Sequence, residues 1–151
     1  MKKYINIALV ILVIIAVGIY SKNKGNVEPV TGCYVASLKN DVYILNIDNQ
    51  NNEKVSGFLT FNNFEKDSSS GSIAGVYKDG ILLAIYTFES EGTTSVMQVI
   101  FKKSENNFVR GYGDMSTTTN EFIDFNAVTY DASTEFKGGP CVENYIRRLQ
   151  P

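Results

Sequence analysis

The sequence predicts an all-β domain, an antiparallel eight-stranded up-and-down barrel, preceded by one N-terminal transmembrane helix. Three observations lead to this prediction. Residues 4–20 are almost wholly apolar, the chain after residue 29 alternates apolar and polar side chains between frequent turns, and no later stretch has sustained helical periodicity. We therefore divide the 151 residues into a membrane anchor or signal segment, residues 1–24, and a β-barrel domain, residues 25–151.

The N-terminal segment reads YINIALVILVIIAVGIY over residues 4–20, with lysines on both sides and no charge within it. Its length is at the lower end of the roughly 17–25 residues that span a bilayer. A basic start and an apolar core also describe a cleaved signal peptide, with Ala16–Gly18 as the cleavage site. The apolar run continues past that site, which favours an anchor that contacts membrane lipid through residues 4–20. The positive charge at the N-terminus then places the barrel outside the cytoplasm, in the periplasm or at the cell surface.

The charge of the domain excludes some classes of function. Four of the 14 Lys and Arg residues precede residue 25, whereas all 16 Asp and Glu residues follow it, which leaves the domain with a formal net charge of −6. Nucleic acid is therefore not an expected partner, because phosphate backbones are bound by basic surfaces. The chain has no histidine, the commonest general base and a frequent zinc ligand. We expect no catalysis, no cofactor and no metal site.

The two cysteines, Cys33 in VTGCYVASL and Cys141 in GGPCVENY, bracket the domain. In a compartment outside the cytoplasm this arrangement favours a Cys33–Cys141 disulfide. Two buried free thiols remain an alternative. Lipidation of Cys33 is a weaker one, because the polar stretch SKNKGNVEP separates this cysteine from the apolar segment.

Each strand is predicted from alternation that ends at turn-forming residues. Asp79-Gly80 stands between two apolar runs and is a strong hairpin signal. The polar stretches NQNN, EKDSSSG, ESEGTT and SENN separate other runs. The expected strands are 30–38, 41–48, 53–61, 72–78, 81–88, 95–103, 107–115 and 121–130, and residues 141–150 are expected to form a helical turn or two.

Short connections make consecutive strands antiparallel neighbours. Eight such strands in an open sheet would leave two unpaired edge strands, and closing the sheet into a barrel pairs them with each other. A two-sheet sandwich is the alternative. Glycines inside the strand patterns indicate bends, bulges or close approach of backbones, as a small barrel requires. These glycines are Gly57, Gly75, Gly111 and Gly113.

The pattern SG-x-L-x-F…EKD…G-x-x-x-G-x-x…Y-x-F-x-SEG…F, which the chain carries from VSGFLTF to SVMQVIF, resembles a group of small bacterial cell-envelope proteins. Many of its members carry an N-terminal lipoprotein signal or a membrane anchor. The resemblance covers about residues 30–142 and implies a β-barrel that is lipocalin-like in outline. It assigns no catalytic residue.

A candidate ligand site lies on the last two predicted strands. Phe108, Arg110, Tyr112 and Asp114 share one face of their strand, and Phe122, Asp124, Asn126 and Val128 share one face of the next. If the two faces meet inside the barrel, Arg110 can pair with Asp114 or Asp124 and orient Tyr112, and a few convergent polar groups of this kind fix a ligand. The alternative is that these side chains face solvent. The predicted ligand-binding residues are Arg110, Tyr112, Asp114, Asp124 and Asn126.

The expected function is therefore that of a membrane-anchored extracytoplasmic binding module for a small apolar or mixed ligand or an envelope protein. The alternative is a structural or inhibitory envelope protein that acts by protein–protein contact. The stretch SSSGSIAGVY is loosely similar to the Ser-Gly loop of bacterial lysozyme inhibitors, which are small envelope β-barrels. The spacing to Tyr77 in this chain is a poor match to that motif.

Overall fold

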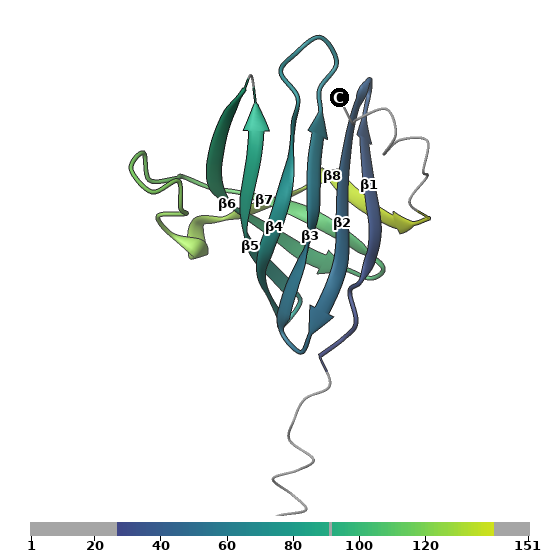
Figure 1. The fold of residues 1–151 in the computed structure, drawn as a ribbon. Helices are drawn as coiled ribbons and strands as arrows, with labels where there is room; N and C mark the ends of the chain where they lie inside the picture. Colours follow the sequence, from purple (N-terminus) through teal and green to yellow (C-terminus); the bar gives the residue numbers. More distant parts are fainter. Residues whose placement is uncertain (1–26, 91, 141–151) are drawn as a thin grey trace, which may run out of the picture.

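A computed structural model describes residues 27–90 and 92–140, which form a closed barrel of eight antiparallel strands in up-and-down order (Figure 1). Each strand pairs with the next along the chain, and β8 closes the ring by pairing with β1. This confirms the predicted barrel. The strands are β1 (Gly32–Leu38), β2 (Asp41–Asn51), β3 (Lys54–Asn62), β4 (Ser69–Lys78), β5 (Ile81–Ser90), β6 (Thr93–Ser104), β7 (Asn107–Tyr112) and β8 (Thr129–Gly139).

Strand alternation fills the barrel with apolar side chains. In β2, Leu45 and Ile47 are fully buried, and in β3 the same is true of Leu59. Large aromatic side chains occupy the middle of the interior, where their rings meet mostly edge to face. The fully buried aromatic residues are Tyr86, Phe101, Phe108 and Phe136.

The β4–β5 hairpin forms where the sequence predicted it. Asp79 and Gly80 both have positive φ, 50° and 79°, as a tight two-residue connection between twisted strands requires. β4 itself begins at Ser69, three residues before the predicted start. Part of the serine-rich stretch that we expected to be a loop is therefore strand.

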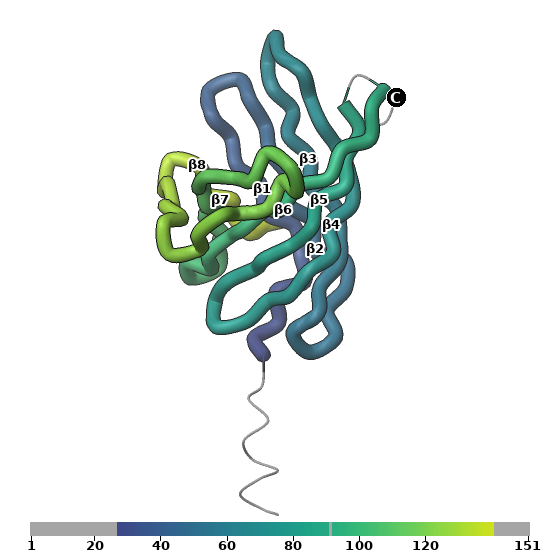
Figure 2. Tube along the Cα trace, turned by 90° about the vertical axis from the view of Figure 1, so that its left-hand side faces the viewer, coloured from purple at the N-terminus to yellow at the C-terminus, as the bar shows by residue number. Residues whose placement is uncertain are grey.

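The predicted eighth strand, residues 121–130, is wrong. Most of this stretch belongs to the long connection between β7 and β8, which contains a short 3₁₀ helix, η1 (Phe125–Ala127). Asp124 caps that helix, because its side chain accepts hydrogen bonds from the backbone and side chain of Asn126. The connection, residues 113–128, packs beside β6, where Asn120 donates to the Val96 carbonyl and Gln98 accepts from the Phe122 amide (Figures 1 and 2).

Closure brings the two ends of the domain together. Cys33 of β1 lies opposite Gly139 of β8, two residues before Cys141. No cysteine among the described residues is a free thiol. Because Cys141 lies outside those residues, the Cys33–Cys141 disulfide remains a prediction, and the β1–β8 register supports it.

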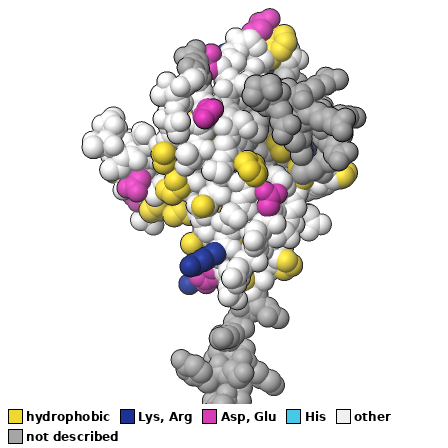
Figure 3. Space-filling model, in the orientation of Figure 1, with side chains coloured by type: hydrophobic (Ala, Val, Ile, Leu, Met, Phe, Trp, Pro, Cys, Tyr) yellow, Lys and Arg dark blue, Asp and Glu magenta, His cyan; other side chains and the backbone are white. Residues whose placement is uncertain are grey.

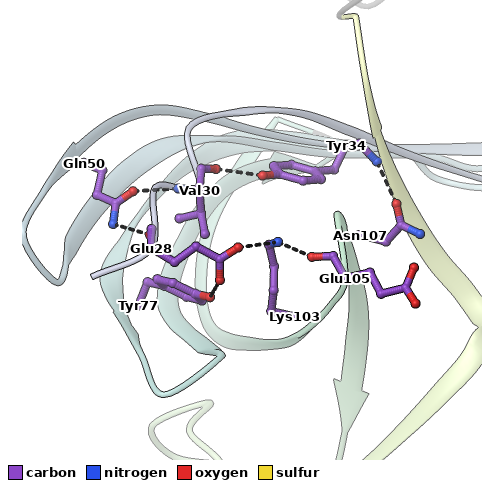
Figure 4. A network of polar contacts seen from close by, with 9 residues as sticks. Glu28, Val30, Tyr34, Gln50, Tyr77, Lys103, Glu105 and Asn107 are labelled. Atoms are coloured by element: carbon purple, nitrogen blue, oxygen red, sulfur yellow. Dashed lines mark hydrogen bonds and ion pairs between the residues drawn. The ribbon is translucent and has the colours of Figure 1, made fainter. Parts of the chain in front are cut away.

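A segment before β1 plugs one end of the barrel (Figure 4). Val30 is fully buried there, its amide donates to Gln50, and its carbonyl accepts from the Tyr34 hydroxyl. The Glu28 carboxylate accepts from Lys103 and from the Tyr77 hydroxyl, each at 3.2 Å. Burial and the hydrogen bond to Glu28 raise the pKa of Tyr77 to about 12. We call this the plugged end.

The Glu28 contacts predict a pH-dependent contribution to stability. The hydrogen bonds from Lys103 and Tyr77 lower the pKa of Glu28 below its ordinary value of 4.5. A carboxylate with a lowered pKa in the folded state stabilises that state above its ordinary pKa, and this contribution is lost as the pH falls through the lowered value. We expect Glu28→Gln to be less stable than the wild type at neutral pH, and the two proteins to converge on acidification.

Urea unfolding across this pH range measures the difference in free energy of unfolding. The control is Glu53→Gln, which removes the exposed Lys78–Glu53 ion pair and should change stability little at any pH. A Glu28→Gln difference that is constant with pH would contradict the role of the ion pair.

Several predicted features fall outside the described residues. They are the N-terminal apolar segment, residues 4–20, the division of the chain after residue 24, and the C-terminal helical turn at 141–150. Within residues 27–90 and 92–140, no helix has the length and apolar character needed to cross a membrane.

Candidate functional site

The end of the barrel opposite the plug is formed by the β1–β2 and β5–β6 turns and the β3–β4 loop, while the 113–128 connection lies against the side of the barrel along β6 (Figure 1). Side chains that point into the barrel near this end retain partial exposure, unlike those in the middle. We call this end the mouth. Its interior-facing, partly exposed side chains are Tyr43, Phe88, Met97, Arg110 and Tyr112.

β7 directs Arg110 into the barrel. Phe108, two residues earlier on the same face of the strand, is fully buried. Arg110 itself lies directly opposite Phe101 of β6, another fully buried interior residue. Side chains of directly opposed residues project from the same face of a sheet, so Arg110 faces the interior and not the solvent outside.

The Arg110 side chain reaches across the interior. Its guanidinium carbon lies 4.2 Å from the centre of the Phe61 ring and 5.0 Å from that of Tyr112. Phe61 belongs to β3, four strands away from β7 in a ring of eight, and therefore to the opposite wall. The cation is thus held between an aromatic ring from each wall, a geometry in which each ring attracts the charge.

Among residues 27–90 and 92–140, no carboxylate forms an ion pair with this cation. The described part of the chain contains two ion pairs, Lys78–Glu53 and Lys103–Glu28, and neither involves Arg110. Burial lowers the pKa of Arg110 below its ordinary value, and the neighbouring Tyr112, Tyr43 and Tyr86 hydroxyl groups offset part of that effect. Arginine still carries its charge at neutral pH.

The guanidinium also keeps contact with solvent. In the described residues, no side-chain nitrogen or oxygen is both fully buried and without a hydrogen bond. Arg110 has five N–H donors. The guanidinium nitrogens that lack a protein partner are therefore open at the mouth.

Asp41, the first residue of β2, is held by two hydrogen bonds. One carboxylate oxygen of Asp41 accepts from the Phe64 amide at 2.7 Å, and the other accepts from the Tyr43 hydroxyl at 3.4 Å. The bond from Phe64 ties Asp41 to the β3–β4 loop.

Of the five predicted site residues, the structure brings Arg110 and Tyr112 together and leaves the other three apart from them. Asp114 is exposed at the start of the 113–128 connection. Asp124 and Asn126 bind each other around η1, also in exposed positions. Asp114 and Asp124 do not pair with Arg110, because the residues expected to form the neighbouring strand form that connection instead. Ligand binding by the five residues stays a prediction.

An irregularity in β8 shapes the wall beside Arg110. The β7–β8 register shifts between Val109 and Gly111, which pair with Glu135 and Tyr130. Residues 131–134 of β8 therefore bulge out between these two pairs. Within the bulge, the Asp131 side chain accepts hydrogen bonds from the Ser133 amide and hydroxyl. Thr134, buried in this segment, accepts from the Tyr112 hydroxyl at 3.3 Å and orients the ring. Bulges of this kind commonly redirect side chains near binding sites.

Sequence reasoning identified the strand face that carries Arg110 but missed its neighbours. Phe61 lies on the same face of β3 as the buried Leu59, but its contact with Arg110 crosses the barrel and leaves no local signal in the sequence. Thr134 lies in a strand that the pattern did not reveal. No group of three or more potential metal ligands occurs in the described residues.

Neither a family model, nor a curated protein, nor a solved structure matches this chain. The closed eight-stranded antiparallel barrel is nevertheless lipocalin-like in outline. Fold alone does not assign a function, so the functional argument depends on the mouth and its residues.

Because Arg110 has no ion pair in the described residues, we expect Arg110→Met to raise the free energy of unfolding by about 1 kcal/mol. Methionine keeps an apolar chain between the two rings and removes the cost of partly desolvating a charge, which we expect to exceed the gain from the two cation–π contacts. Urea unfolding of both proteins measures the change.

The control is Lys102→Met, which removes an exposed cation 5.6 Å from the Tyr130 ring on the outer surface. We expect it to change stability by less than about 0.5 kcal/mol. A large loss of stability in Arg110→Met would show that an ion pair or hydrogen-bond network holds the guanidinium.

Proposed function

We propose that this chain is a membrane-anchored binding module whose barrel lies outside the cytoplasm and holds a small molecule at its mouth, without catalysis. The observation that carries the proposal is Arg110, a cation inside the barrel with aromatic contacts and no counter-ion in the part of the chain that the structure describes. Removing such a charge from part of its water costs folding free energy, and function is a common reason for that cost.

The surroundings of Arg110 support a ligand site. Small-molecule sites are mostly apolar, with a few polar groups that fix orientation. The mouth has this composition, with Tyr43, Phe88 and Met97 presenting partly exposed apolar surface beside one charge and a few hydroxyl groups.

The membrane part of the proposal is carried by composition. Residues 4–20 form an uncharged apolar run that precedes the plugged end by a few residues. An anchor there would place the membrane on the side of the plug and leave the mouth facing away from it.

Native mass spectrometry of the full-length chain, released from detergent micelles with a set of small neutral and charged aromatic compounds, tests the proposal. We expect one-to-one adducts that Phe88→Ala weakens. The control is Phe58→Ala, since Phe58 is 55% exposed on the outer face of β3. A screen without adducts, or adducts that both variants affect equally, would contradict a site at the mouth.

A structural or inhibitory role through protein–protein contact is the second candidate, and exposed apolar side chains favour it. Ile123 is 69% exposed and Phe125 49% exposed in the 113–128 connection. Val96 of β6, whose carbonyl accepts from Asn120 of the same connection, is 46% exposed. Figure 3 shows hydrophobic side chains gathered on the left of the molecule, where this connection lies in Figure 1. Capture of an envelope protein by the wild-type chain but not by Ile123→Asp would support this role. The structure gives no support to the loose likeness to lysozyme inhibitors. Tyr77 is only 3% exposed, and its hydroxyl donates to Glu28, so this side chain is not presented to a partner.

A further inference from the structure

We infer that the ligand of the mouth is a small monocarboxylate with a short or planar apolar body, bound through its carboxylate by the Arg110 guanidinium. This inference rests on the proposed small-molecule function and names the chemical class of the ligand.

Charge matching selects a single negative charge. Arg110 is one cation without a carboxylate partner in the described residues. Its planar fork of N–H groups fits the two oxygens of a carboxylate, and such bidentate pairs are among the strongest hydrogen-bonded contacts in proteins. A bound monocarboxylate therefore supplies the missing counter-ion and leaves the site neutral.

The rim of the mouth disfavours ligands with two negative charges. The described turn and loop residues around it carry more acidic than basic side chains. A second negative charge on the ligand would remain uncompensated among these carboxylates, whose potential repels it. The rim residues with charge are Lys39, Asp41, Glu65, Lys66, Asp67 and Glu89.

Packing beneath Arg110 limits the length of the ligand. Phe61 is 8% exposed, and Tyr86 and Phe136 are at most 1% exposed, so aromatic rings fill the interior below the guanidinium. Phe61 packs edge to face on both Tyr43 and Tyr86. A long acyl chain would have to displace these side chains, and native cores resist such overpacking.

The body of the ligand therefore lies toward solvent, against the partly exposed rings of Tyr43, Phe88 and Tyr112. Flat aromatic surfaces favour a planar partner, since offset stacking adds to the burial of apolar area. An aromatic monocarboxylate such as benzoate has both required features, and benzamide matches its shape without the charge.

Two-dimensional NMR of the full-length, ¹⁵N-labelled chain in detergent micelles tests the inference through the Arg110 Nε–H signal and the amides of Phe61 and Tyr112. The probes are benzoate, benzamide and phenyl phosphate. We expect benzoate to shift these signals saturably, at least tenfold more tightly than either other probe. Arg110→Lys should weaken benzoate binding about tenfold, because it keeps the charge and loses the bidentate fork.

Arg110→Met should abolish the benzoate response while the rest of the spectrum keeps its dispersion. Lys102→Met is the matched control, and it should bind benzoate like the wild type. Equal responses to benzoate and benzamide, with Arg110→Met unchanged, would overturn the carboxylate assignment and leave the small-molecule function standing. Tighter binding of phenyl phosphate than of benzoate would overturn the inferred ligand class and favour a dianionic ligand.

A mouth that responds to none of the three probes would also overturn this inference. The proposed function is decided separately, by the mass-spectrometric screen, which includes neutral compounds and does not depend on Arg110.

Discussion

Phe108→Ala is expected to lower the free energy of unfolding by about 3–5 kcal/mol, the usual cost of removing a buried phenylalanine ring. Phe108 is fully buried and its ring centre lies 4.9 Å from that of Tyr34, 6.1 Å from that of Tyr77 and 6.4 Å from that of Phe101. These partners come from β1, β4 and β6, so one side chain links strands all around the barrel. The substitution leaves a cavity, and the surrounding strands can close it only in part because they are held in a closed barrel.

Urea unfolding followed by near-ultraviolet circular dichroism of tyrosine measures this change, because the chain contains no tryptophan. Phe58→Ala is the control, since Phe58 is 55% exposed, and it should shift stability by no more than about 0.5 kcal/mol. Equal effects of the two substitutions would mean that Phe108 does not occupy the barrel interior.

Gly57→Ala is expected to cost about 1–3 kcal/mol, although alanine has the better intrinsic propensity for ordered structure. A Cβ at position 57 would lie 1.9 Å from the carbonyl oxygen of Asn46 and 2.9 Å from Cα of Ile47. Both atoms are backbone of β2, so the methyl group can be accommodated only by a shift of strand against strand. The β2–β3 register already shifts between Ile47 and Asn49, next to this contact.

Gly139→Ala is the matched control for this experiment. Gly139 also lies in a strand, has no atom within 4 Å of its would-be Cβ, and does not have a positive φ. We expect its replacement to be neutral or to stabilise the protein by up to about 1 kcal/mol. Opposite signs for the two substitutions support close approach of β2 and β3, and the same sign for both would contradict it.

The first seven strands could be predicted because each has a strong local signal. Alternating large apolar residues mark β2 and β3, and the Asp79-Gly80 pair marks the turn between β4 and β5. The last strand lacks such a signal. In β8 the buried side chains are Thr134 and Phe136, whereas the preceding stretch EFIDFNAVTY alternates well but is held in a connection by the Asp124 cap.

The candidate site was predictable only on one strand. Alternation correctly grouped Arg110 and Tyr112 with the buried Phe108, and the structure places this face inside the barrel. The predicted partners on the next strand depended on residues 121–130 being that strand. The contact with Phe61 depends on the width of the closed barrel, which no local pattern contains.

The position of the Arg110 side chain decides whether the mouth can form the proposed site. In a ¹³C,¹⁵N-labelled sample of the full-length chain, nuclear Overhauser effects between the Arg110 side-chain protons and the ring protons of Phe61 report on it. Because the guanidinium carbon lies 4.2 Å from the Phe61 ring centre, we predict strong effects to that ring and to Tyr112. Absence of any effect to Phe61, together with contacts from Arg110 to residues of the outer surface, would contradict the binding site proposed at the mouth.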